Sequence, residues 1–281
     1  MSIPSLYTAV TGMQAHQQFM DVVANNLANV NTVGFKGSRA LFEDALSQTL
    51  HAPTAPSATT PGANGAQIGL GVSLSSVTPL FSQGALQSTA QPSDVAIEGG
   101  GFFVLKDPIT NAQFYSRAGA FNVDLNGFLT SPTGQRVQGA VAPAADGDAL
   151  VDMQIPAAVG GIPVTGFNID QGGRVIASLQ DGTTAVTGQI TLEKFNNPAA
   201  LAKVGNNMYQ SSPAAGPSFN SYHTPTTDGL GSLRSGYLEL SNVDLGQEFA
   251  DMIRAQRGLQ ANARVITTSD QIMEELINLK R

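Results

Sequence analysis

The sequence predicts an α+β fold, with helices at the two ends of the chain that pair as a coiled coil and a mainly antiparallel β domain between them. Apolar residues recur at alternating three- and four-residue spacings at both ends, which is the pattern of a helical seam. Between the ends, short apolar runs are separated by glycine-containing turns. The composition agrees, because 30 glycines, 15 prolines and a charged fraction of only 12% are typical of turns and short strands.

The first predicted helix begins near Pro4, a residue that the first helical turn tolerates. It ends before the run Asn29–Gly34, where Gly34 suits a left-handed turn after the helix. The apolar seam of this helix contains Leu6, Val10, Met13, Met20 and Leu27.

The second predicted helix follows the cap-like segment Ser241–Asp244 and runs to the end of the chain. Its seam contains Leu245, Phe249, Met252, Leu259, Ile266, Met273 and Ile277. Neither helix has a partner next to it in the sequence, so we expect the two ends to meet each other or neighbouring copies. The alternative is that two amphipathic helices simply cover one face of a single domain.

Residues 1–45 and 240–281 together are predicted to form the helical domain, and residues 68–239 the β-rich domain. We expect residues 46–67 to be an extended connector, because residues 45–93 have no formal charge and the segment is rich in proline, alanine and threonine. The strand-like runs are 68–77, 94–105, 113–123, 127–138, 166–179 and 187–195. Turn signals such as Leu125–Gly127 and Gln180–Gly182 indicate antiparallel pairing.

Charge and cysteine content exclude several classes of function. A net charge of −7 with only 14 basic residues argues against binding to nucleic acid, which needs clustered lysine and arginine. No window is apolar enough for a membrane span, and residues 1–20 lack the basic side chain of a Sec-type signal peptide. The absence of cysteine excludes disulfides, thiolate catalysis and cysteine-based zinc sites.

No motif indicates a catalytic, cofactor or metal site. The glycine-rich run Glu98–Phe102 lacks the ending of a phosphate-binding loop, and Asp146–Asp148 lacks the spacing of a calcium loop. His16, His51 and His223 have no second ligand at metal-binding spacing. Two other classes stay open from the residues alone: a secreted β-rich adhesin or binding module, and a carbohydrate hydrolase with two carboxylates.

The run Asn25–Lys36 resembles the signature of bacterial flagellar rod and hook proteins, the axial proteins that build the shaft between motor and filament. The residues of this signature are Asn25, Asn26, Asn29, Asn31, Gly34, Phe35 and Lys36. Further segments that resemble the family are 94–103, 115–121, 124–127, 195–198, 205–209 and 240–257. The likeness therefore covers nearly the whole chain except the connector and residues 141–165.

The resemblance implies a structural subunit without enzymatic activity or cofactor, which polymerises into a helical tube and transmits torque. The paired terminal helices would form the inner polymerisation domain and the β domain the outer layer. The implied partners are copies of the same chain, other axial proteins of the rod, the hook–filament junction and the hook cap, and the type III export apparatus. The implied location is the flagellum or its basal body, reached without a cleaved signal peptide.

Different parts of the sequence resemble two different members of this family. The long connector and the short chain resemble the distal rod, whereas Gln138–Gly139 and the ending 260–279 resemble hook proteins. Many hook proteins have an additional outer domain near the position of residues 141–165, for which this chain has no room. We predict a hook subunit, with a distal rod subunit as the alternative.

Overall fold

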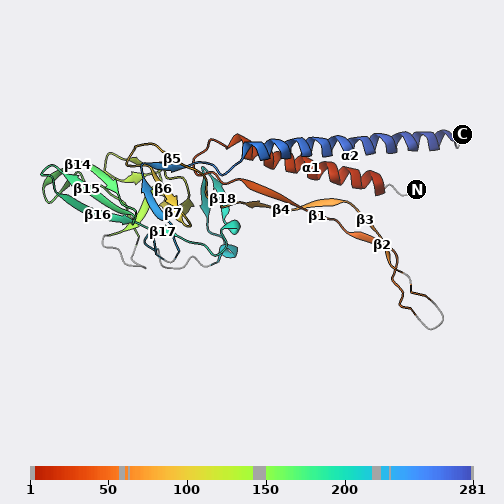
Figure 1. Ribbon diagram of the computed structural model, residues 1–281, viewed down its shortest axis with the longest axis horizontal. Coiled ribbons are helices and arrows are strands. Elements are labelled where there is room, and N and C mark those ends of the chain that lie inside the picture. Colours follow the sequence, from red (N-terminus) through yellow and green to blue (C-terminus); the bar gives the residue numbers. More distant parts are fainter. Residues whose placement is uncertain are drawn as a thin grey trace. The chain divides into compact units, whose positions relative to one another are not determined.

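The computed structural model describes residues 4–56, 61–62, 64–141, 150–216, 223–227 and 229–279, and the chain divides into two compact units. The helical unit contains Met1–Ala28, Ser38–Pro79 and Asp244–Arg281. The β unit contains Asn29–Gly37 and Leu80–Val243. Two terminal helices and a mainly antiparallel β sheet between them confirm the predicted α+β class (Figure 1).

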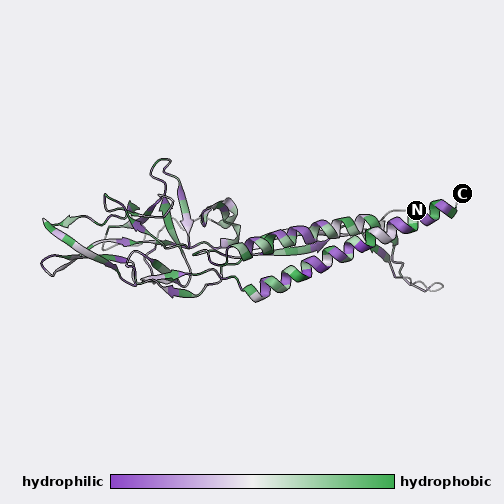
Figure 2. Cartoon of the chain, turned by 90° about the horizontal axis from the view of Figure 1, so that it is seen from above, coloured by the Kyte–Doolittle hydropathy of each residue, from purple (hydrophilic) through white to green (hydrophobic). Residues whose placement is uncertain are grey.

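The helical unit is built on an antiparallel pair of helices, α1 (Pro4–Ala28) and α2 (Leu245–Leu279). Gly12 lies against Asn262 and His16 against Gly258, so the contact residues ascend on one helix and descend on the other. Asp244 is the N-cap of α2, because its Oδ1 accepts a hydrogen bond from the backbone N–H of Gly246 at 2.8 Å. Hydrophobic and hydrophilic residues alternate along both helices, as Figure 2 shows.

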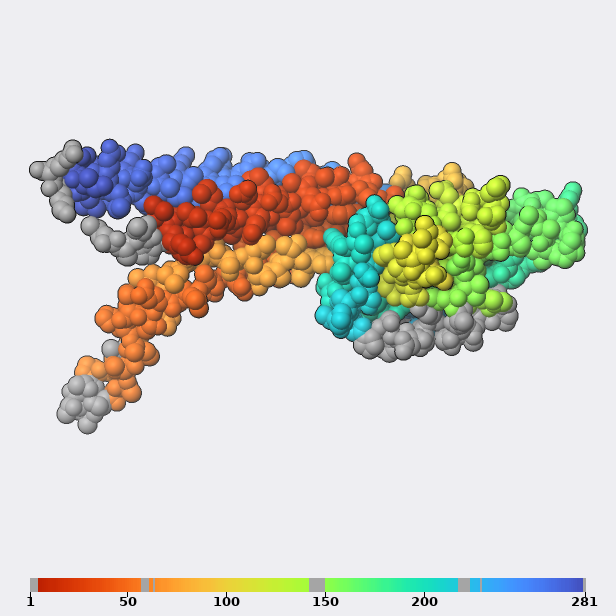
Figure 3. Space-filling model, turned by 180° about the vertical axis from the view of Figure 1, so that it is seen from behind, coloured from red at the N-terminus to blue at the C-terminus, as the bar shows by residue number. Residues whose placement is uncertain are grey.

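A ribbon of four strands accompanies the helices in this unit: β1 (Ser38–Asp44), β2 (Ser47–His51), β3 (Ala66–Gly69) and β4 (Val72–Pro79). Strand β1 pairs with β4, and β2 pairs with β3, both antiparallel. The ring of Phe42 packs on α1, with its centroid 5.6 Å from that of Phe19 and 6.0 Å from that of His16. Figure 3 shows the orange ribbon beside the red helix α1.

The division of the structure differs from the expected domain boundaries. Residues 46–67, expected to be an extended connector, include β2 and the first residues of β3, which hydrogen-bond to each other as a hairpin. The run 68–77, expected in the β-rich domain, lies in the helical unit because β4 pairs with β1 there. How the assembled protein divides into inner and outer domains stays a prediction.

Small residues bring α1 and α2 together. The most buried apolar positions on the two helices are Ala9, Ala15, Val23 and Ala255. A Cβ atom added to Gly12 would lie 2.6 Å from Nδ2 of Asn262, and one added to Gly258 would lie 2.5 Å from the ring of His16. The helix axes therefore approach closely only because glycine and alanine occupy the contact.

The β unit contains a branched sheet of 13 strands among the described residues, with the main order β13-β14-β15-β16-β11-β7-β8-β19-β18. Strands β9, β10, β12 and β17 join it at the side, and the pairs β20–β6 and β21–β5 form two further ladders. The strand bounds are β5 (Leu86–Ser88), β6 (Val95–Glu98), β7 (Phe102–Lys106), β8 (Gln113–Ser116), β9 (Asn122–Val123), β10 (Leu129–Thr130), β11 (Arg136–Ala140), β12 (Val151–Asp152), β13 (Ala158–Val159), β14 (Ile162–Ile169), β15 (Arg174–Leu179), β16 (Thr184–Ile190), β17 (Leu192–Glu193), β18 (Ala202–Gly205), β19 (Met208–Gln210), β20 (Ser232–Ser235) and β21 (Tyr237–Glu239). Two 3₁₀ turns, Pro198–Ala200 and Pro213–Ala215, complete the unit.

Strand β7 is buried on both faces and separates two hydrophobic clusters. Phe103 and Leu105 enter a large cluster with Ile97, whereas Phe102 and Val104 enter a smaller one. This alternation follows from the two-residue period of a strand. The predicted turns are present too: Gly127 and Gly182 have positive φ angles of 81° and 83° at their hairpins.

The close contact between the helices leads to a first prediction. Gly258→Leu should destabilise the helix pair by about 1–3 kcal/mol, because the new side chain overlaps the His16 ring. Thermal unfolding of the full chain, followed by circular dichroism at a helical wavelength, measures the loss.

The double variant Gly258→Leu with His16→Ala should recover part of the loss by making room. Gly69→Leu is the control, since a Cβ atom at Gly69 meets nothing within 4 Å. Equal stability of the Gly258 variant and the control would contradict close packing at this position.

Candidate functional site

The segment that carries the family resemblance forms polar contacts in each unit, and in the helical unit they centre on Asn26. Its side chain is 3% exposed. The Oδ1 atom accepts from the Ser38 N–H at 2.9 Å, and Nδ2 donates to the Ser38 carbonyl at 2.8 Å and to Oε1 of Glu248 at 3.0 Å. Burial raises the pKa of the Glu248 carboxyl, and the hydrogen bond from Asn26 opposes that rise. One amide thus joins α1 to the start of β1 and to α2.

The next residues of the segment belong to the β unit and form a turn. The Asn29 Oδ1 accepts from the Thr32 hydroxyl at 3.1 Å, and Gly34 has a φ angle of 68°. A Cβ atom on Gly34 would lie 2.6 Å from the backbone N of Ala118, so only glycine fits. Nδ2 of Asn207 donates to the carbonyl of Val33 at 2.8 Å.

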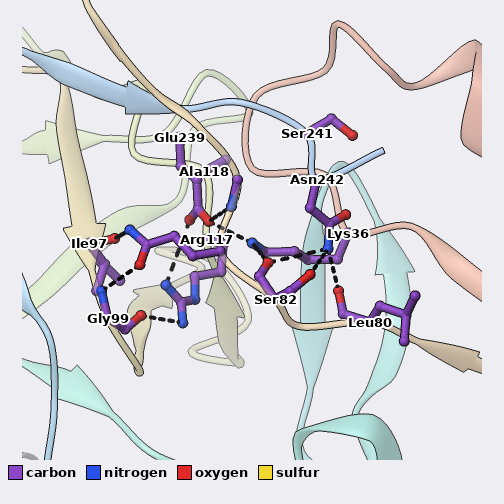
Figure 4. Close-up of polar contacts among 12 residues, drawn as sticks. Lys36, Leu80, Ser82, Ile97, Gly99, Arg117, Ala118, Glu239, Ser241 and Asn242 are labelled. Carbon is purple, nitrogen blue, oxygen red and sulfur yellow. Dashed lines mark hydrogen bonds and ion pairs between the residues drawn. The ribbon is translucent and has the colours of Figure 1, made fainter. Parts of the chain in front are cut away.

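The segment ends in a buried ion pair between Lys36 and Glu239, both side chains 0% exposed (Figure 4). The Lys36 Nζ lies 2.6 Å from Oε1 of Glu239 and donates to the Ser82 carbonyl at 2.8 Å. The same carboxylate oxygen accepts from the Gly84 N–H at 2.9 Å. Burial lowers the pKa of Lys36, and the contact with Glu239 opposes that lowering.

Arg117 adds a second buried cation beside Glu239. Its Nη1 lies 3.6 Å from Oε2 of Glu239, and its Nη2 donates to the Gly99 carbonyl at 2.9 Å. The guanidinium also stands over the ring of Phe102, 5.4 Å from its centroid. We call Lys36, Arg117 and Glu239 the ion cluster.

Asn242 continues this network to the backbone around Lys36. Its Oδ1 accepts from the Gly37 N–H at 2.9 Å, and its Nδ2 donates to the Leu80 carbonyl at 2.8 Å and to the Ser82 hydroxyl at 2.8 Å. The backbone N–H of Gly34 donates to the Glu239 carbonyl at 2.7 Å. The ion cluster and Asn242 therefore connect segment 33–37 to two other segments of the β unit, residues 80–84 and residues 239–242.

The remaining signature residues take simpler positions. Phe35 is buried, with Nζ of Lys203 5.3 Å from its ring centroid. Asn25 and Asn31 lie on exposed positions of α1 and of the following turn. Asn29 and Asn31 lie in the turn that follows α1, whereas Asn26 lies within the helix and pairs with the backbone of Ser38. The residues Glu239 and Ser38 carry no local motif, so sequence reasoning missed them.

The predicted seam residues differ in their exposure. On α1 all five, Leu6, Val10, Met13, Met20 and Leu27, are half-buried. On α2, Met252, Leu259 and Ile266 are half-buried, whereas Leu245, Phe249, Met273 and Ile277 are 42–63% exposed. The small residues beside the seam are therefore the most buried on the two helices, and four large seam residues of α2 remain at the surface.

Three of the exposed apolar residues on α2 follow each other at a spacing of four. Leu245 is 44% exposed, Phe249 50% and Ile253 57%. We call these residues the apolar stripe. A contiguous exposed apolar stripe is typical of a surface that packs against another protein.

Within the described residues, no group of three or more His, Asp or Glu side chains is placed to hold a metal ion. The described helices include none that is long and apolar enough to cross a membrane.

Antiparallel terminal helices in one unit and a β unit held by a buried ion cluster define an α+β protein with paired termini. Three family models match this chain: "Flagella basal body rod protein" at residues 6–36, "Flagellar hook protein FlgE/F/G D1 domain" at 96–177 and "Flagellar basal body rod FlgEFG protein C-terminal" at 234–279. The flagellar basal-body rod protein FlgG of Bacillus subtilis is 42% identical over 99% of each chain. The chain belongs to the family of bacterial flagellar rod and hook proteins.

The relatives favour the rod over the hook. A second FlgG rod protein, from Buchnera aphidicola of Schizaphis graminum, is 38% identical over 279 residues, covering 99% of this chain and 100% of the relative. The hook protein FlgE of Borreliella burgdorferi is 28% identical, and its alignment extends over 442 residues because the hook protein is longer. The predicted hook subunit is therefore supported less well than its alternative, the rod subunit.

The ion cluster leads to a second prediction. Glu239→Gln should destabilise the β unit by about 3–5 kcal/mol, because it leaves two buried cations without a counter-charge. Lys36→Met should lower the free energy of unfolding by less, since the Glu239 carboxylate still pairs with Arg117. Urea unfolding followed by circular dichroism compares the two variants.

Asp170→Asn is the matched control, an acid-to-amide change in an exposed ion pair with Arg174, and should cost less than about 1 kcal/mol. A Glu239→Gln variant as stable as this control would show that the cluster contributes nothing to the stability of the β unit.

Tyr209 leads to a third prediction, on alkaline pH. Burial raises the pKa of Tyr209 to about 12, with Arg117 opposing, whereas an unfolded tyrosine ionises near pH 10. The unfolded state therefore loses this proton first, so stability falls as pH rises from 10 and the contribution is lost through pH 12. The loss amounts to at most about 3 kcal/mol.

Tyr209→Phe should remove this part of the alkaline destabilisation, measured as the free energy of unfolding at pH 9 and pH 12. Tyr237→Phe, at a less buried tyrosine, is the control. Identical pH dependence of wild type and Tyr209→Phe would contradict the prediction.

Proposed function

We propose that this chain is a distal rod subunit of the bacterial flagellar basal body, which polymerises into a helical tube and transmits torque. The observation that carries the proposal is the full-length match to rod proteins of the same length, at 42% identity over 99% of both chains. The role is mechanical, without catalysis or cofactor. The hook is the second candidate, because the hook protein of Treponema pallidum is 48% identical over 149 residues, although these cover only 32% of that protein.

The exposed surface of α2 supports self-assembly through the helical unit. The apolar stripe faces away from α1, since Leu245, Phe249 and Ile253 are each at least 44% exposed while Ala255 is buried against it. Complete burial of such a side chain is favourable by about 1.5–3 kcal/mol. Because these three are already about half covered, burial between copies adds about half of that for each. The partners we infer are copies of this chain, neighbouring axial proteins and the type III export apparatus, with the flagellar basal body as the location.

Imaging of purified basal bodies that contain a tagged chain tests the position in the flagellum. We expect the label on the straight shaft below the hook. A label confined to the curved hook would replace the proposal by the hook alternative.

A fourth prediction concerns the apolar stripe. Phe249→Asp should abolish assembly, because a charge in a helix contact is costly to desolvate. The β unit should keep its stability, since Phe249 belongs to the helical unit. Electron microscopy of assembled tubes and urea unfolding of the soluble chain measure the two effects.

Thr267→Asp is the control, since it places the same charge at another exposed position of α2. Normal tubes from Phe249→Asp would exclude the apolar stripe from the assembly contact.

A further inference from the structure

Two asparagines of the sequence are followed directly by glycine, in the pairs Asn64–Gly65 and Asn126–Gly127. In such a pair the backbone nitrogen of the glycine can attack the side-chain carbonyl carbon of the asparagine, Cγ, and release the side-chain amide as ammonia. Glycine favours this reaction, because it has no Cβ to obstruct the approach and adopts backbone angles that other residues avoid. The nitrogen must also be able to turn towards Cγ, so the fold decides which pair reacts.

The pair Asn126–Gly127 is held in place by hydrogen bonds of the β unit. The Gly127 N–H donates to the Asp124 carbonyl at 2.8 Å, and the Gly127 carbonyl accepts from the Ile155 N–H at 2.7 Å. The Asn126 carbonyl accepts from Nε2 of Gln154 at 2.9 Å. The Gly127 nitrogen can therefore reach Cγ of Asn126 only after these bonds break.

The pair Asn64–Gly65 lies in the helical unit, directly before β3, and both residues are exposed. The ladder between β2 and β3, which Figure 1 shows side by side, ends at the pair His51–Ala66. Among the described residues, the Gly65 N–H has no hydrogen-bond acceptor and the Asn64 side chain has no hydrogen-bond partner. Nothing in this part of the chain therefore holds the nitrogen away from Cγ.

Prolines explain why the backbone around Asn64 is not fixed by a ladder. Pro53 lies opposite Gly65, since a Cβ atom added to Gly65 would lie 3.1 Å from Cδ of Pro53. Pro56 lies opposite Gly62 in the same way, at 3.0 Å. Proline has no N–H to donate to a facing strand. The segment after β2 therefore lacks two of the donors that a continuous ladder would use.

We propose that Asn64 is a site of spontaneous deamidation and that the fold protects Asn126 from the same reaction. The Gly65 nitrogen gives up its proton and bonds to Cγ of Asn64, while the Nδ2 group takes up a proton and leaves as ammonia. The product is a cyclic imide. One water molecule then opens either carbonyl of the imide, which leaves an aspartyl or an isoaspartyl residue at position 64. This inference does not depend on the proposed function.

Deamidation at position 64 changes the charge of an otherwise uncharged stretch. Residues 45–93 have no formal charge, so the new carboxylate is the only one between Asp44 and Asp94. An isoaspartyl residue also lengthens the backbone by one methylene group. Because the reaction does not regenerate the amide, the fraction of chains that carry this charge increases with the age of the protein.

Timed incubation of the purified full chain at mildly alkaline pH tests the proposal. Peptide mapping by mass spectrometry gives the fraction of acid at positions 64 and 126 at each time. We expect deamidation at position 64 to be faster by about tenfold or more, because a protected site reacts only when its hydrogen bonds open locally. In concentrated urea the two rates should become similar, since neither pair is then held by the fold.

Asn64→Gln is the matched control, because glutamine keeps the amide but would have to close a larger ring. The acidic species that isoelectric focusing detects in the incubated wild type should be strongly reduced in this variant. Gln154→Ala removes the hydrogen bond to the Asn126 carbonyl and should raise the rate at position 126 without changing the rate at position 64. No deamidation at position 64 of the folded chain, or equal rates at the two positions, would overturn the proposal.

Discussion

The carboxylate of Glu239 is the group on which the β unit depends. It is fully buried, and it holds one ammonium, one guanidinium and one backbone N–H from three separate segments of the chain. Burial of an ion is unfavourable unless its partners are close, so these segments are fixed relative to each other within the unit. A hydrophobic cluster of the same size would stabilise the unit as well, but it would not specify which side chains must meet.

Several segments that resemble the family come together around this carboxylate. Lys36 ends the first of these segments, Arg117 lies in the third, and Asn242 lies in the last. The glycine-rich segment contributes the Gly99 carbonyl that accepts from Arg117. A glycine-rich run that suggests an anion-binding loop in isolation is therefore a strand end that provides a carbonyl to a buried arginine.

The sequence was sufficient to predict both terminal helices, the β runs and their turns, because periodicity and glycine act locally. It was not sufficient to predict the contact between the helices, where Gly12 and Gly258 lie against polar side chains and the large apolar residues lie to one side. A heptad pattern is recognised by its large apolar side chains. Two helix axes, however, can approach closely only where the side chains between them are small. Strand β2 and residues 66–67 of β3 were missed as well, since β2 is exposed along its whole length and its residues give no alternating apolar pattern.

The ion pair between Lys36 and Glu239 spans 203 positions of the sequence. A chain that emerges from a ribosome or a narrow pore with its N-terminus first exposes Lys36 early and Glu239 only near the end. Long-range contacts of this kind delay folding until both partners are present. A chain that stops before residue 239 therefore lacks the counter-charge for both buried cations. Only a chain that includes Glu239 can complete the fold of the β unit.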